Sequence, residues 1–162
     1  MTDKYVFFLR EWPSQWRIAP MTVNGILYNC CEQYMMHQKA LTFNDLETAA
    51  KIMEAPTPRE QKDLGREVKG YDDAVWSQVR YGVVLTGNFA KFMQNHGLRH
   101  KLLDTGFREF VEANPKDPIW GIGKAETDAD LLDEAQWGQN LLGKVLTEVK
   151  YNLIRSLDQK IY

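Results

Sequence analysis

Cys31-Glu32-Gln33-Tyr34-Met35-Met36-His37-Gln38-Lys39-Ala40 is the stretch around which we expect the rest of the chain to be organised. If it is a helix, residues three, four and seven positions apart share one face, and these are Glu32, Met35, Met36, Lys39 and Phe43. Burying a charge costs free energy unless another group compensates it, so two charges on an apolar face are unusual for a core helix. Either Glu32 and Lys39 line a pocket with an apolar floor, which we prefer, or they form the solvated edge of an amphipathic helix.

The composition is that of an ordinary soluble globular protein. The 162 residues predict a single domain spanning 1–162, with 44% hydrophobic and 26% charged residues. A net charge of -2 gives no electrostatic footprint for nucleic acid or an anionic membrane. It still allows a nucleic-acid substrate bound at one local basic site. No apolar run approaches the roughly 20 residues that span a bilayer, so we expect no membrane partner.

The start of the chain and its cysteines favour a cytoplasmic protein. Met1-Thr2-Asp3-Lys4 lacks the basic flank and long apolar core of a secretory signal. The two cysteines, Cys30 and Cys31, are neighbours, which excludes a disulfide framework, and we expect buried thiols. The three histidines offer no metal-ligand spacing, so we expect neither a metal nor another cofactor; they are His37, His96 and His100.

The first thirty residues predict a small β element. Lys4 to Leu9 is aromatic and β-branched, as in a first or edge strand. Met21 to Tyr28 predicts a hairpin, because Asn24-Gly25 supplies the positive φ values of a type I′ turn. Between them, two tryptophans flank Ser14-Gln15 and are either core anchors, which we favour, or the lip of a site that stacks a flat ligand; they are Trp12 and Trp16.

The remainder of the chain predicts helices. Asn44 or Asp45 is expected to cap one through about Glu54, Pro58 to begin another that ends near Gly65, and Asp72 or Asp73 to cap a third that includes Val84. Segments 89–94 and 98–103 predict short helices, 107–112 a strand or a last helical turn, and 125–135 an exposed loop or short helix. Residues 137–140 open the longest helical pattern, an apolar stripe to Leu157 in which Gly143 implies close packing. We therefore predict one compact, mainly α domain.

Two further features are candidates for function. Asn114 to Gly123 holds two prolines and two glycines around Asp117 and Trp120, which predicts a rigid irregular loop of the kind that often carries function. Arg66 follows Gly65 at a predicted helix end. It is either a surface charge that complements the helix dipole or a phosphate clamp, a role that suits its bidentate guanidinium.

An ordered set of motifs over about residues 5–155 resembles the NADAR, or YbiA-like, domain family. The matching motifs are Ser14-Gln15-Trp16, Cys31-Glu32-Gln33-Tyr34-Met35-Met36 with Lys39-Ala40, Leu64-Gly65-Arg66, Trp76, Ala90-Lys91-Phe92 with Gln94-Asn95, Leu103 with Thr105-Gly106, Val111-Glu112-Ala113, Asp117 with Trp120-Gly121-Ile122-Gly123, and Asn140-Leu141-Leu142-Gly143. The chain departs from the family at 8–13, where a loop richer in Gly or Asn is expected. That departure bears on the entry side of the site and hence on substrate choice.

The resemblance implies a multihelical α+β fold with a small N-terminal β element, and an enzyme that hydrolyses the N-glycosidic bond from ribose C1 to an amine or base nitrogen. Members act on ribosylamino-pyrimidine intermediates of riboflavin biosynthesis. Others remove ADP-ribose from guanine in DNA or RNA, sometimes countering a partner ADP-ribosyltransferase. The resemblance carries the family's acidic and tryptophan positions over to Glu32, Trp76 and Asp117, and its cationic positions to Lys39 and Arg66.

The chemistry suits these residue types, because cleavage at an anomeric carbon passes through an oxocarbenium-like state that a carboxylate stabilises. We expect Glu32 to act as acid/base or cation stabiliser, Asp117 to orient ribose or water, and Trp76 to stack on the leaving base or close the pocket. Lys39 and Arg66 would hold phosphate, although Lys39 can alternatively attack C1 of the opened sugar and form a Schiff base. Five residues either line the site or support it: Ser14, Gln15, Trp16, Trp120 and Asn140.

Three classes of function remain open at this level. The first is a metal-independent N-glycosidase, for which the near-neutral charge slightly favours a small phosphorylated ribosyl substrate over ADP-ribosylated nucleic acid. The second is a module that binds ADP-ribose or a nucleotide without turnover. The third is a structural protein that binds no small molecule.

Overall fold

The computed structural model describes residues 3–159, and Met1 and Thr2, which entered the argument about a signal sequence, lie outside them. The chain divides into two compact units. We call 15–96 the continuous unit, and 3–14 with 97–159 the composite unit. The described residues form six α-helices and four short strands, which confirms the mainly α prediction. The prediction of a single domain spanning 1–162 stays a prediction.

The continuous unit begins with the predicted hairpin. Strands β2 (Met21–Val23) and β3 (Ile26–Tyr28) pair antiparallel. Asn24 and Gly25 have φ values of 51° and 78° in the turn between them, as a type I′ turn requires. The hairpin leads directly into helix α1 (Cys31–Thr42), as expected.

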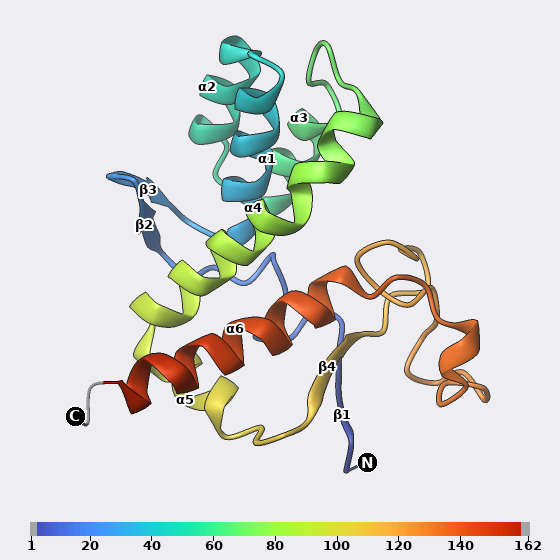
Figure 1. Ribbon diagram of the computed structural model, residues 1–162. Coiled ribbons are helices and arrows are strands. Elements are labelled where there is room, and N and C mark those ends of the chain that lie inside the picture. The colour runs from blue at the N-terminus through green and yellow to red at the C-terminus, as the bar shows by residue number, and fades with distance from the viewer. Residues whose placement is uncertain (1–2, 160–162) are drawn as a thin grey trace. The chain divides into compact units, whose positions relative to one another are not determined.

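Helix α1 is the centre of the continuous unit. It packs against α2 (Leu46–Glu54), α3 (Pro58–Gly65) and α4 (Asp73–Gln94), which surround it in Figure 1. Because neighbours cover several of its sides, the seven consecutive residues from Cys31 to His37 are all buried. The adjoining core cluster consists of Met21, Tyr28, Cys31 and Tyr34.

The caps of these helices follow the sequence. Asp45 accepts a hydrogen bond from the Thr48 N–H at the start of α2, Thr57 and Glu60 form a capping box at α3, and the Asp72 carboxylate caps α4. Helix α4 runs unbroken from 73 to 94, so the prediction of a separate helix at 89–94 is wrong. It is also longer than the C-terminal helix, so the longest helix was predicted in the wrong place.

The reason for the unbroken α4 is tertiary packing at Gly87-Asn88, a pair that disfavours helix by propensity. A Cβ added at Gly87 would lie 2.6 Å from the Tyr34 ring, so α4 passes close to α1 here and only glycine fits. Asn88 is fully buried and its amide is hydrogen-bonded. Contacts with α1 and its surroundings therefore override the local preference.

In the composite unit, strand β1 (Tyr5–Phe8) pairs in parallel with β4 (Glu109–Glu112), with Tyr5 opposite Glu109. This confirms the first strand, and the segment predicted at 107–112 as a strand or a helical turn is a strand over its last four residues. Helix α6 (Leu141–Asp158) packs against β4 (Figure 1). The close packing predicted at Gly143 is confirmed, because an added Cβ would lie 2.2 Å from the Phe110 carbonyl oxygen.

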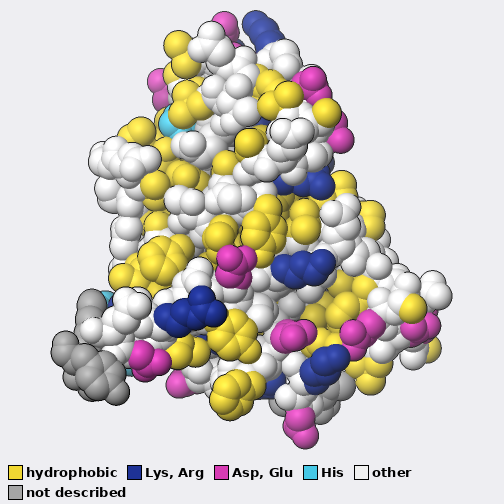
Figure 2. Space-filling view, viewed as in Figure 1, with side chains coloured by type: hydrophobic (Ala, Val, Ile, Leu, Met, Phe, Trp, Pro, Cys, Tyr) yellow, Lys and Arg dark blue, Asp and Glu magenta, His cyan; other side chains and the backbone are white. Residues whose placement is uncertain are grey.

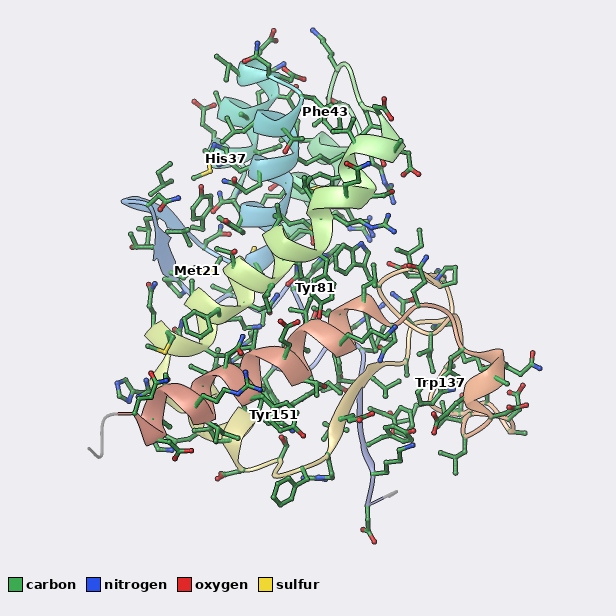
Figure 3. The ribbon with its side chains drawn as sticks, viewed as in Figure 1. Met21, His37, Phe43, Tyr81, Trp137 and Tyr151 are labelled. Atoms are coloured by element: carbon green, nitrogen blue, oxygen red, sulfur yellow. The ribbon has the colours of Figure 1, made fainter. Side chains whose placement is uncertain are left out.

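The remaining connections are short or irregular. Helix α5 (His96–Leu103) starts two residues before the predicted 98–103. Residues 114–123 contain neither helix nor strand, as expected for a Pro/Gly-rich loop, and an exposed segment follows that ends in a 3₁₀ turn, Glu134–Gln136. Trp137 anchors this region (Figure 3), since its indole N–H donates to the Leu131 carbonyl at 2.7 Å.

On the face seen in Figure 2, acidic and basic side chains are mixed and neither kind forms a patch of its own. This agrees with the small net charge of -2. Within 3–159, every helix is too short or too polar to cross a membrane.

Candidate functional site

Glu32 lies at the second position of α1 and is 7% exposed, so the alternative of a solvated helix edge is wrong for this residue. Cys30, the N-cap, makes no side-chain capping bond. The Glu32 N–H instead donates to the main-chain oxygen of Gln15 at 3.1 Å. The helix dipole favours a carboxylate at this end. The sequence therefore places a buried acid where the backbone stabilises its negative charge.

Lys39 lies two turns further along α1 and is half-buried. Its Nζ donates to the Gly65 carbonyl, the last of α3, at 2.7 Å. It also lies 4.5 Å from the ring centroid of Tyr71, against which Phe43 packs at the end of α1 (Figure 3). The predicted face of α1 therefore continues into an aromatic and cationic cluster.

The charges of two other predicted site residues act on Lys39 in the continuous unit. Burial lowers the pKa of Lys39, the Glu32 carboxylate opposes that change, and the Arg66 guanidinium lowers the pKa further. Lys39, whose Nζ is bound to the Gly65 carbonyl at the end of α3, is therefore the residue on which the charges of Glu32 and Arg66 both act.

Arg66 follows the last residue of α3, as predicted, and is exposed. Its Nη1 lies 3.8 Å from the Asp63 carboxylate, an exposed ion pair of the kind that contributes little to stability. The guanidinium is therefore accessible to an anion. Both interpretations, helix-end charge and phosphate clamp, fit this position.

The tryptophans near Ser14 differ from one another. Trp12 packs edge-on against Phe110, with ring centroids 5.8 Å apart, in the composite unit. Trp16 is 40% exposed, so the core interpretation is wrong for it, and the Lys62 Nζ lies 5.8 Å from its ring centroid.

Trp76 lies in the first turn of α4 and is 4% exposed, which is an ordinary core position. Its stacking role stays a prediction.

Asp117 belongs to the composite unit and helps to build its own loop. Its Oδ1 accepts hydrogen bonds from the N–H groups of Ile119 and Trp120, each at 2.9 Å, which is an Asx turn. The Trp120 carbonyl accepts from the Leu142 N–H at 3.0 Å and so ties the loop to α6. The predicted rigidity of this loop has a clear physical basis.

Asn140 and Ser14 have structural contacts in the same unit. The Asn140 Oδ1 accepts from the Glu112 N–H and its Nδ2 donates to the Phe110 carbonyl, both at 3.0 Å. These bonds fasten the start of α6 to β4, which favours a supporting role over substrate contact. Ser14 is 8% exposed and its N–H donates to the Glu11 carbonyl at 3.0 Å.

The structure therefore groups the predicted residues into two sets. Gln15, Trp16, Glu32, Lys39, Arg66 and Trp76 lie in the continuous unit, and Ser14, Asp117, Trp120 and Asn140 in the composite unit. The convergence of Glu32 with Asp117 on one sugar joins the two sets and stays a prediction.

Two buried polar residues of α4 had no predicted role, Asn88 and Lys91, and both are 0% exposed. Burial lowers the pKa of Lys91, whereas Cys31 and Cys30 raise it. The signal for Lys91 was a lysine between Ala90 and Phe92 inside an apolar helix face. Asn88 offered none, since asparagine after glycine ordinarily suggests a helix break.

The prediction of buried thiols is confirmed. Cys30 and Cys31 are free and buried, and burial raises their pKa values to about 11 and about 12, so both are protonated at neutral pH. His37 is buried as well, and burial lowers its pKa; its Nδ1 lies 2.9 Å from the Tyr28 hydroxyl on the hairpin side of α1 (Figure 3). No group of three or more His, Cys, Asp and Glu in residues 3–159 has the geometry to hold a metal ion.

The chain is similar in sequence to a known domain family and to proteins that bear enzyme names. The model of the NADAR domain matches residues 2–154. N-glycosidase R617 of Acanthamoeba polyphaga mimivirus is 40% identical over 165 residues, which cover 92% of this chain and 96% of R617. Riboflavin biosynthesis protein VVA0006 of Vibrio vulnificus is 31% identical over 146 residues, 85% of this chain but only 36% of that longer protein.

A solved structure is also similar. The NMR structure of the E. coli protein YbiA matches with a TM-score of 0.77 and 27% identity, over 97% of this chain and 89% of that one. The E. coli protein carries the name N-glycosidase YbiA.

Proposed function

Because the chain belongs to the NADAR domain family, we propose that it is an N-glycosidase that hydrolyses the bond from ribose C1 to an amine or base nitrogen. The observation that carries this proposal is the buried Glu32 carboxylate on the same helix as Lys39, a cation on which the charges of Glu32 and Arg66 both act. An acid and two cations in one unit suit a substrate with an anomeric carbon at one end and phosphate at the other. The names of R617 and YbiA support the same reaction class.

In the proposed reaction the C1–N bond breaks and its electron pair stays on nitrogen, which takes up a proton. The oxygen of a water molecule bonds to C1 and that water loses a proton, so a free ribose and a free amine leave. Positive charge on C1 and the ring oxygen is largest in the transition state, where the negative Glu32 carboxylate stabilises it. The same carboxylate can transfer the proton between water and the leaving nitrogen.

The other residues bind and orient in this proposal. Asp117 orients ribose or the attacking water from the rigid loop, and Trp76 stacks on the leaving base or closes the pocket. Arg66 and Lys39 bind the substrate phosphate. We assign Lys39 this role, rather than attack on C1, because its Nζ is already fixed by the Gly65 carbonyl as a cation at a helix end.

For the substrate we propose a ribosylamino-pyrimidine phosphate of riboflavin biosynthesis, the pathway that the name of the Vibrio relative mentions. The alternative is ADP-ribose on guanine in DNA or RNA, for which a partner ADP-ribosyltransferase is expected. The exposed Trp16 with Lys62 beside it favours this alternative, since such a pair can stack an additional base. We further propose a cytoplasmic enzyme that needs no metal, so EDTA should leave its rate unchanged.

The test is incubation of the purified protein with each substrate class, with the products separated by chromatography and identified by mass. Release of ribose phosphate and free pyrimidine supports the proposal. Release of ADP-ribose from modified DNA alone would replace the substrate. If neither substrate is cleaved but ADP-ribose or ribose 5-phosphate raises the melting temperature, the chain is a binding module. If neither substrate is cleaved and neither ligand changes the melting temperature, the chain is a structural protein.

A further inference from the structure

A pair of buried amides lies beside the start of α1 in the continuous unit. Asn88 of α4 is 0% exposed and Gln15 is 9% exposed. The Asn88 Nδ2 donates to the Gln15 Oε1 at 2.7 Å and to the Val84 carbonyl at 2.9 Å. Helix α4 therefore holds the Gln15 side chain through a direct hydrogen bond.

The orientation of the Asn88 amide is set by its neighbours. Two acceptor oxygens face its Nδ2, so a flipped amide would place its own oxygen against both. In this orientation the buried Asn88 Oδ1 has no hydrogen-bond partner among the described residues. An unsatisfied buried acceptor opposes folding. Asparagine at this position is thus not explained by stability alone.

Gln15 in turn contacts the segment that carries Glu32. Its main-chain oxygen accepts from the Glu32 N–H at 3.1 Å, and its Nε2 lies 3.7 Å from the Met35 sulfur, one turn further along α1. The first N–H groups of a helix have no intrahelical partner, and Cys30 provides no side-chain cap. Gln15 therefore supplies an acceptor that the first turn of α1 needs.

We propose that Asn88 is a positioning residue: it fixes Gln15, which fixes the backbone from which the Glu32 side chain projects. The inference rests on the proposed function of Glu32. The close approach of Gly87 to Tyr34 strengthens it, because the α4 backbone next to Asn88 has no room to shift against α1. Asn88 itself acts only through Gln15 and Glu32.

The test begins with Asn88→Leu, which keeps the number and branching of the side-chain heavy atoms and removes the hydrogen bonds. We expect kcat to fall about 10- to 100-fold with KM changed less than about threefold, because displacement of a catalytic group by ~1 Å has an effect of that order. Ile52→Val, a fully buried change on α2 of the same unit, is the matched control: it should lower the melting temperature and leave kcat unchanged.

Dependence on Glu32 separates positioning from a general effect on the fold. In the Glu32→Gln background, Asn88→Leu should cause no further loss of kcat. Gln15→Met removes the acceptor of the same hydrogen bond. It should lower kcat as Asn88→Leu does, and the double variant should show no further loss of kcat. A full additional loss in either background would overturn the inference.

A readout without turnover keeps the inference testable if the proposed function fails or a variant is inactive. Hydrogen exchange of the Glu32 amide should be faster in Asn88→Leu than in wild type, and unchanged in Ile52→Val. Faster exchange in a protein that cleaves neither substrate would reject the proposed function and keep the positioning role. Unchanged exchange would reject the positioning role, whatever the activity.

Discussion

Glu32 and Asp117, the two carboxylates proposed for the reaction, are held by different kinds of structure. Glu32 lies on a regular helix and is fixed through its main-chain N–H by Gln15. Asp117 lies in an irregular loop, and its own carboxylate closes the turn that holds it. A change at Glu32 can therefore remove chemistry and leave the backbone intact, whereas most changes at Asp117 alter loop and chemistry together.

The largest effect is expected for Glu32→Gln. The amide keeps the shape but loses the negative charge and the proton transfer, so kcat should fall about 10²- to 10⁴-fold. The affinity for product, measured by calorimetry, should change little. Glu54→Gln, an exposed change at the end of α2, is the control and should retain full activity. If the Gln variant kept wild-type turnover, Glu32 would not be the reacting acid.

For Asp117 the comparison predicts that two substitutions, to Asn and to Ala, have different effects on stability. Asp117→Asn keeps an Oδ1 that accepts from the Ile119 and Trp120 N–H groups, so the melting temperature should stay near wild type while kcat falls about 10- to 100-fold. Asp117→Ala removes the carboxylate and also the two hydrogen bonds from the Ile119 and Trp120 N–H groups. It should therefore lower the free energy of unfolding by about 1–2 kcal/mol. Thermal melts and initial rates measure both effects. Equal activity of Asn and wild type would leave Asp117 a purely structural residue.

Lys39 sharpens the comparison on the side of the helix. Lys39→Arg keeps a cation for phosphate but cannot form a Schiff base, whereas Lys39→Met loses both. If Lys39 binds phosphate, Arg should change KM by less than about threefold and Met should raise it about 10-fold. If it attacks C1, both variants are inactive, and borohydride with substrate adds a covalent mass to the wild-type protein alone. Initial rates and intact mass distinguish these results.

The difference between helix and loop also sets how far the sequence could predict the molecule. Local rules placed α1, the Asn24-Gly25 turn, the caps of α2 and α4, and Pro58 at the start of α3, because each depends on neighbours within a few residues. They failed at Gly87-Asn88, where contacts with α1 and Gln15 override helix propensity. Pairing of β1 with β4, about a hundred residues apart, leaves no mark in either strand.

For the candidate site, periodicity predicted that Glu32 and Lys39 share a face but not that Glu32 is buried. Burial of that residue follows from three helices packing around α1, which no pattern within α1 records. Likewise, the sequence identified Asn140 but not its use, since both of its amide atoms bond to β4 from 28 and 30 residues away. The ordered motifs predicted which residues belong to the candidate site, but they did not predict which hydrogen bonds those residues make.

The smallest effect on activity is expected for Lys150 of α6, the counterpart of Lys39 in the composite unit, because it should act on stability alone. Lys150 is fully buried and its Nζ donates to the Thr105 hydroxyl and the Arg108 carbonyl. Burial lowers its pKa to about 8, Arg108 lowers it as well, and Glu109 opposes them. In the unfolded chain the pKa is about 10.4, so between these values the unfolded state binds more protons and stability rises with pH.

Lys150→Met should abolish that rise. The variant loses two hydrogen bonds at every pH, so the informative quantity is the change with pH: the wild type should gain about 2–3 kcal/mol relative to Lys150→Met between pH 7 and pH 10. Urea unfolding at the two pH values measures it, with the exposed Lys144→Met on the same helix as control. A difference between wild type and Lys150→Met that is the same at both pH values would mean that Lys150 keeps its proton throughout. The buried cation of the composite unit would then be as firmly charged as a surface lysine, because its two acceptors would compensate fully for its burial.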